Sequence, residues 1–169
     1  TWIPLLNRSA GCGLFIIIAY LAVQHRRMTH DLMKAATREV EHQALRLRES
    51  LLAKNAEELQ DLYDHAPCGY HSLDPDGLII AMNQTELNWL GYTKQEVLGK
   101  KRFSDLLTSA GVQLFQEQFP IFRKEGRVHG LEFDMVRKNG TTFPTLLSAT
   151  AITDADGRFV ASRSTLVDI

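Results

Sequence analysis

The sequence lacks an excess of charge of either sign. Its 19 Lys and Arg residues are balanced by 20 Asp and Glu residues, and the net charge at pH 7 is −1. A nucleic-acid-binding surface needs clustered basic side chains that contact phosphates, whereas here the balance also holds locally along the chain. We therefore expect no nucleic-acid partner.

Cysteine is scarce as well. Only Cys12 and Cys68 occur, and they lie far apart in very different sequence surroundings. This arrangement argues against a disulfide framework and fits a protein in a reducing compartment.

Motifs of catalytic sites are also missing. There is no phosphate-binding glycine loop and no nucleophile elbow. Asp74 and Asp76 form a carboxylate pair, and so do Asp154 and Asp156, but both pairs stand in turns, where Asp is favoured for its bonds to the local backbone. We expect no catalytic residue in this segment, and a catalytic output domain beyond Ile169 remains open.

Neither of two histidine-containing segments gives a convincing chemical site. Residues 29–32 (THDL) superficially resemble the phospho-acceptor helix of histidine kinases, but the Asn/Thr-Pro step that should follow is absent. His65, Cys68 and His71 are spaced by three residues, yet no second cluster supplies further zinc ligands. We predict a solvated helix face at the first segment and a helix-to-strand junction, with no metal, at the second.

An apolar run does stand near the start of the chain. Residues 9–23 contain no charged side chain, and Arg26 and Arg27 follow directly. The run is shorter than the ~20 residues of a membrane span, but residues 2–6 extend it, and Arg8 between them can reach the headgroups. We predict a transmembrane helix over residues 1–24, with the rest of the chain in the cytoplasm. A signal-peptide core and a buried soluble helix are the alternatives.

Residues 28–65 contain neither glycine nor proline, which predicts an unusually long helix. Its apolar positions form the two rows of a heptad seam: Met33, Val40 and Leu47, and Thr37, Ala44 and Leu51. We predict that residues 25–64 form a coiled coil that dimerises the chain, the alternative being one helix packed on its own domain. The stripe shifts at Leu51 and Leu52, where we expect a register change that relays a signal.

From residue 65 onward, short strands and short helices are predicted instead. Strands are expected at 69–73 and 78–82, from 131, and at 143–152 and 158–169, with tight turns between the last three. Helix starts are expected at Asn83, at Thr93, and at Thr108 or Ser109. This order predicts an α+β domain in which helices cover one side of an antiparallel sheet.

The short motifs at the turns and element boundaries of this region resemble those of a PAS domain. Residues 74–83, 89–92 and 96–99 are similar to its first half, and residues 137–140, 154–157 and 167–169 to its second. The resemblance implies a five-stranded antiparallel sheet flanked by short helices over residues 65–169, acting as a sensory and dimerisation module.

The order of membrane segment, coil and PAS domain is similar to the input half of sensor histidine kinases in the bacterial inner membrane. The input region of a diguanylate cyclase and a ligand-free dimerisation module are the alternatives. The chain starts with Thr1 rather than Met and stops at a strand-like Asp168-Ile169, so we expect an output domain after it and assign signal relay to Asp168, Leu51 and Leu52.

A sensory domain of this kind can hold a ligand in a cavity between its sheet and its helices. Candidate lining residues of a cavity between sheet and helices are Trp89, Phe115, Phe119, Phe133 and Met135. An aromatic stripe of this spacing also fits a packed core, which we favour. Residues 100–103 lack the reactive cysteine of photoactive flavin relatives, and residues 108–125 lack the usual haem histidine. Non-covalent flavin or a small metabolite remains open.

Overall fold

The computed structural model describes the backbone of residues 3–169 and the solvent exposure of residues 13 and 15–169. The chain divides into two compact units, Thr1–Ala56 and Glu57–Ile169. Helix α1 (Ile3–Asp64) contributes to both. Of the predicted membrane segment, residues 1–12 and 14 lie outside the described side chains. Among the residues described, no helix is both long and apolar enough to cross a bilayer.

Helix α1 is continuous through Leu51 and Leu52. The predicted shift of the apolar stripe therefore changes the apolar face of the helix and does not interrupt its backbone hydrogen bonding. The two rows of the heptad seam lie open to solvent, with Val40 exposed by 65% and Leu47 by 62%. A coiled-coil dimer that covers this row stays a prediction.

The second unit contains a five-stranded antiparallel sheet, ordered β2-β1-β5-β4-β3. The strands are β1 (Gly69–Leu73), β2 (Ile79–Met82), β3 (Arg127–Val136), β4 (Thr142–Thr153) and β5 (Phe159–Asp168). Strand β1 pairs with β5, so the first strand of the unit and the last lie side by side at the centre of the sheet. This arrangement confirms the predicted fold class.

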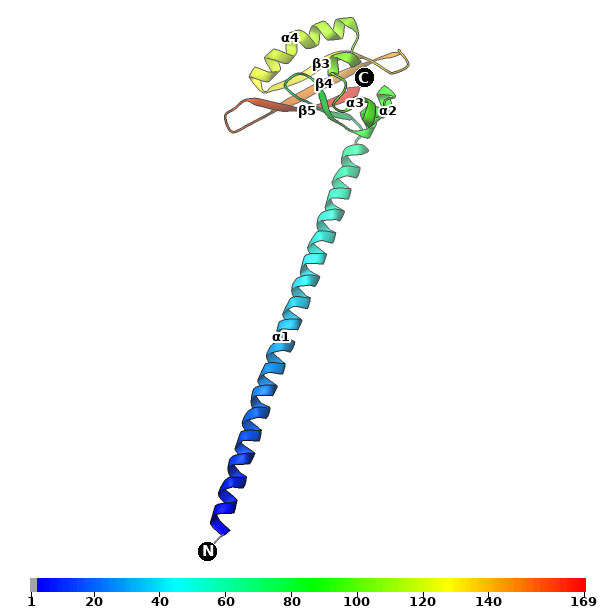
Figure 1. Cartoon of the computed structure of the whole chain (residues 1–169). Helices are drawn as coiled ribbons and strands as arrows, with labels where there is room; N and C mark the ends of the chain where they lie inside the picture. Colours follow the sequence, from blue (N-terminus) through cyan, green and yellow to red (C-terminus); the bar gives the residue numbers. More distant parts are fainter. Residues whose placement is uncertain (1–2) are drawn as a thin grey trace. The chain divides into compact units, whose positions relative to one another are not determined.

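Apart from the end of α1, all helices of this unit follow β2 and precede β3 along the chain. They are α2 (Gln84–Leu90), α3 (Lys94–Val97), the 3₁₀ helix η1 (Phe103–Leu106) and α4 (Ser109–Glu125). The longest, α4, runs across one face of the sheet (Figure 1). Its start follows from Thr108, whose hydroxyl accepts a hydrogen bond from the N–H of Gly111, and its end from Gly126, which has a left-handed φ of 80°.

The core lies between these helices and one face of the sheet. Alternate residues of each strand point toward that face. On β4 these residues are Phe143, Thr145, Leu147 and Ala149, all buried. Strand β3 begins at Arg127, four residues earlier than the sequence pattern predicts, because the pairing with β4 shifts register between Val128 and Leu131. That irregularity breaks the alternation from which the strand start was predicted.

Candidate functional site

A small cavity lies inside the second unit, between the inner face of the sheet and the helices. Its aromatic lining includes Phe103, Phe115 and Phe119, and the polar residues beside it are His71, Gln118, Ser162 and Ser164. Its volume is about 30 Å³, which is enough for about one water. The space itself is bordered by apolar surface, and the polar atoms of these residues lie within the surrounding protein.

His71 is held in place by a buried carboxylate. Its Nδ1 lies 3.0 and 3.1 Å from the two carboxylate oxygens of Glu86 on α2, and both side chains are fully buried. The imidazole also stacks on Phe103 with ring centroids 4.8 Å apart. Among the described residues, His71 Nε2 is the one buried side-chain polar atom without a hydrogen-bond partner.

The two serines lie beside His71. Ser164 is the register partner of His71 across β1 and β5. Its hydroxyl lies 3.1 Å from that of Ser162, which also accepts a hydrogen bond from the N–H of Leu73 at 2.9 Å. Since two hydroxyls use one proton for their mutual bond, one further O–H remains to donate to another group.

The helix that carries Glu86 is tied to the end of α1 by Asn83. The Asn83 amide donates to the carbonyls of Tyr63 and Cys68 at 2.9 and 3.0 Å. Its carbonyl oxygen accepts from the backbone N–H groups of Tyr70 and Glu86, both at 3.0 Å. One buried side chain thus caps α2 and joins it to β1 and to the last turn of α1.

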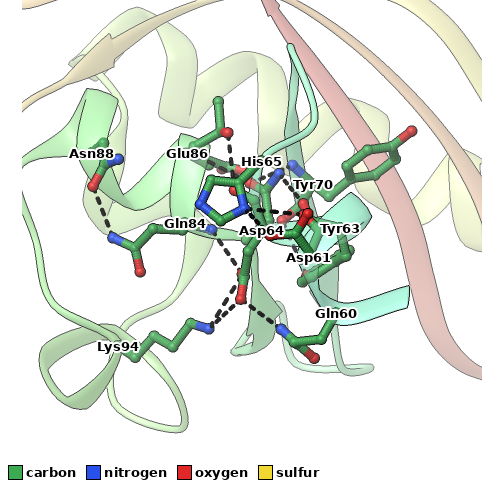
Figure 2. A network of polar contacts seen from close by, with 12 residues as sticks. Gln60, Asp61, Tyr63, Asp64, His65, Tyr70, Gln84, Glu86, Asn88 and Lys94 are labelled. Atoms are coloured by element: carbon green, nitrogen blue, oxygen red, sulfur yellow. Dashed lines mark hydrogen bonds and ion pairs between the residues drawn. The ribbon is translucent and has the colours of Figure 1, made fainter. Parts of the chain in front are cut away.

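Asp64, the last residue of α1, makes the second connection (Figure 2). It accepts hydrogen bonds from Gln60, from the N–H of Gln84 and from Lys94. Burial alone would raise the pKa of Asp64, but these bonds and the charge of Lys94 outweigh it and hold the pKa below its usual value. Burial, with the charges of Glu86 and Asp64, raises the pKa of Tyr63 to about 12.

Of the residues predicted to line the cavity, the structure brings together three: Phe115, Phe119 and Phe133. Met135 is fully buried in the core and is not part of the cavity wall. Trp89 contacts Phe143 edge to face and is not part of the cavity wall. A role of Phe115, Phe119 and Phe133 in binding a ligand remains a prediction.

The remaining predicted residues do not form one site. Asp168 is exposed at the end of β5, paired in register with Thr145. Leu51 and Leu52 lie exposed in the first compact unit. His65 bonds the neighbouring Asp61, while His71 is buried, and within the described part of the chain no cluster of metal ligands occurs.

The residues that sequence reasoning missed are Glu86, Ser162, Ser164 and the role of Asn83 beyond capping. The spacing of Asn83 and Glu86 indicates a helix start in which the glutamate bonds back to the cap, but Glu86 turns into the core to His71 instead. In the folded chain Gly69 leaves the space that Glu86 occupies, because a Cβ there would lie 3.0 Å from a Glu86 carboxylate oxygen.

The PAS domain family model matches residues 67–169, more than half of the chain. The chain belongs to the PAS domain family. It is 29% identical over 92 residues to the phosphoserine phosphatase RsbP of Bacillus subtilis, which covers 53% of this chain and 22% of that protein. It is 27% identical over 108 residues to the sensor kinase CckA of Brucella abortus, covering 62% of this chain and 11% of that protein.

A similar solved structure is the PAS domain of an HTR-like protein from Haloarcula marismortui. The two agree with a TM-score of 0.63 at 25% identity, over 73% of this chain and 99% of that one. The alignments with RsbP and CckA cover only a minor part of those proteins' length. From the family match and these similarities, the chain is a PAS sensory module similar to those found in signalling proteins.

Proposed function

We propose that this PAS module transmits the state of its interior cavity to helix α1, as the input region of a sensor histidine kinase. The observation that carries the proposal is the continuous set of buried contacts from the cavity to α1. It runs from His71 to Glu86, from Glu86 along the first turn of α2 to Asn83, and from Asn83 to the carbonyl of Tyr63.

These contacts are suited to relay because they are few and buried. A shift of His71 moves Glu86, since no other described side chain hydrogen-bonds that carboxylate. Asn83 and Asp64 both bond the first turn of α2, so a displacement of α2 changes how the last turn of α1 is held. Packed elements of this kind tend to have discrete arrangements, which a ligand or a partner can bias.

The similarity to the sensor kinase CckA supports the kinase setting. The similarity to the phosphatase RsbP keeps open a different output after the same kind of module. We further propose a homodimer through α1 and the PAS unit, because the exposed heptad row leaves an apolar seam for a second copy.

A chimera tests the relay. Residues 1–169 are fused to the catalytic half of a histidine kinase that has lost its own input region, and autophosphorylation is measured. Lys94→Ala removes the ion pair with Asp64, which is 3.3 Å long, and we expect kinase activity to change at least about threefold. Lys138→Ala is the matched control, because Lys138 pairs with Glu96 away from α1. Equal activity of wild type, Lys94→Ala and Lys138→Ala would contradict the relay.

We also propose that residues 1–24 tether the module to the bacterial inner membrane, with the PAS unit in the cytoplasm. The uncharged run 9–23 and the two arginines after it support this. The chain should stay with the membrane pellet after a carbonate wash, and Ile16→Arg combined with Leu21→Arg should release it. Recovery of the unaltered chain in the supernatant would overturn the tether.

A further inference from the structure

A second hollow lies on the outer face of the sheet, on the side away from the core. It is an open groove of about 840 Å³ that crosses β1, β5, β4 and β3 and is bordered by Tyr63 in the last turn of α1. Within the described part of the chain, the hydroxyls of Ser72 and Thr150 in this groove have no hydrogen-bond partner. The groove therefore has room for a small molecule and hydroxyl groups to bind it.

Two arginines stand in one row of this groove. Arg127 on β3 is the register partner of Thr150 on β4, and Thr150 is the register partner of Arg163 on β5. Residues that lie directly opposite on paired strands point to the same face of a sheet. Because neighbouring strands are about 4.8 Å apart, the Cα atoms of the two arginines are separated by about 10 Å. Both guanidinium groups can therefore reach a ligand that sits above Thr150.

Neither arginine is engaged by the protein itself. Among the residues described, Arg127 and Arg163 form no ion pair, side-chain hydrogen bond or ring contact. Arg123 and Arg137 of the same unit, in contrast, each donate to a backbone carbonyl and lie over a Phe ring. Like charges in one row of a sheet repel each other, and an anion bound between them would remove this repulsion.

The charges of the groove favour an anion with two negative charges. Arg127 and Arg163 supply two permanent positive charges. Glu125 is the one carboxylate among the residues described at the groove, and it pairs with neither arginine there. Guanidinium groups bind phosphate oxygens through two parallel hydrogen bonds, and a phosphate monoester carries close to two negative charges at neutral pH. The hydroxyl of Thr150 can donate to a further phosphate oxygen.

Two tyrosines border the other end of the groove. The rings of Tyr63 and Tyr70 have their centroids 5.9 Å apart (Figure 2). Tyr70 is the register partner of Thr165, which follows Arg163 by two positions on β5. An organic group of a few atoms that is joined to the phosphate can therefore reach these rings, whose faces favour apolar and aromatic groups.

We propose that this groove binds a small phosphate monoester, with its phosphate between Arg127 and Arg163 and its organic group against Tyr63 and Tyr70. Two arginines are too few for a nucleic acid, whose binding takes many phosphate contacts. A monoanion leaves one of the two arginines without a partner. The groove lies on the opposite face of the sheet from the interior cavity, and its occupation does not depend on the relay.

Phenyl phosphate and phenyl sulfate test the proposal, because they have nearly the same shape, whereas only the phosphate is mainly a dianion at about pH 7.5. The 169-residue chain is labelled with ¹⁵N-arginine, and the Nε resonances of Arg127 and Arg163 are followed during titration at constant ionic strength. We expect saturable shifts with phenyl phosphate at a Kd of about 1 mM, and at least about fivefold weaker binding of phenyl sulfate. Equal binding of the two esters, or no saturable response to phenyl phosphate, would overturn the proposal.

Variants locate the binding in the groove. Arg127→Gln and Arg163→Gln should each weaken the binding of phenyl phosphate at least about tenfold, and Thr150→Glu should abolish it by placing a carboxylate between the arginines. Arg158→Gln is the control, because Arg158 pairs with Asp156 outside the groove. All four positions are exposed, so the fold should tolerate each change. Unaltered binding in Arg127→Gln and Arg163→Gln would show that the anion binds elsewhere and would refute the site.

Inorganic phosphate tests the organic half of the ligand. It offers the same oxygens to the arginines but has no group for Tyr63 and Tyr70, so it should bind at least about threefold more weakly than phenyl phosphate. Binding of inorganic phosphate as tight as that of phenyl phosphate would overturn the assignment of a monoester.

Discussion

At the scale of single residues, Gly69 is the position where the buried pair of His71 and Glu86 depends on the absence of a side chain. A Cβ at Gly69 would lie 3.0 Å from a Glu86 oxygen and 3.1 Å from the Cβ atoms of Glu86 and Leu166. None of the three can move freely, because Glu86 and Leu166 are fully buried.

We therefore expect Gly69→Ala to lower the free energy of unfolding by about 1–3 kcal/mol, through overpacking. Urea denaturation measures this change. Ser72→Ala, on the same strand but on the outer face of the sheet, should stay within about 0.5 kcal/mol of wild type. If Gly69→Ala is as stable as Ser72→Ala, the close packing of Glu86 against β1 is wrong.

Asp64 gives a prediction that depends on pH. Its pKa is lower in the folded chain than in the unfolded chain, so its contacts stabilise the fold above the unfolded value of about 4. That contribution is lost as the pH falls through the lower folded value. The stability difference between wild type and Asp64→Asn should therefore be constant near neutral pH and shrink below about pH 4. A difference that grows on acidification would contradict this account.

At the scale of elements, Asn83 decides how α2 is joined to its neighbours. Its side chain makes four hydrogen bonds to backbone groups of α1, β1, α2 and the segment that joins α1 to β1, and it is fully buried. Asn83→Ala should cost about 2–4 kcal/mol of unfolding free energy, because a cap is lost and buried backbone groups lose their partners. Asn88→Ala, exposed on the same helix, is the control, and an equal loss in both variants would refute the special role of Asn83.

The same elements show what the sequence could and could not predict. Local signals act within a few residues, so the helix starts at Asn83 and Thr108 were predicted where they occur. The contact between His71 and Glu86 joins residues 15 positions apart, and it depends on how α2 packs on β1. Periodicity contains no information on such a contact, and it also failed at β3, where the register shift disturbs the alternation.

The candidate cavity was predictable only on its apolar side. The helical spacing of Phe115 and Phe119 placed them on one face of α4, and that face borders the cavity. The polar residues of β1 and β5 beside it depend on the pairing of these strands, which is not encoded in either strand alone. Trp89, the pocket candidate on α2, packs against Phe143 and is not among the residues at the cavity wall.

At the scale of the whole molecule, dimerisation through α1 is the first property to test. Leu47 and Leu51 are exposed by 62% and 53% in the single chain, as expected for seam positions that a second copy would cover. Replacing both with Lys should convert a dimer into a folded monomer in analytical ultracentrifugation. His42→Lys combined with Glu49→Lys adds charge on the opposite side of the heptad and should leave the dimer intact. A dimer that survives Leu47→Lys with Leu51→Lys would exclude this seam as the interface.

Amide hydrogen exchange tests most directly whether a change inside the cavity alters how the end of α1 is held. Ser164→Val fills the cavity and removes a hydroxyl, whereas Thr165→Val alters the neighbouring residue on the outer face of β5. We predict that exchange at residues 60–65 changes at least about threefold in Ser164→Val and remains at the wild-type rate in Thr165→Val. A change in Ser164→Val that stays within β1 and β5 and leaves the end of α1 unaffected would contradict the account.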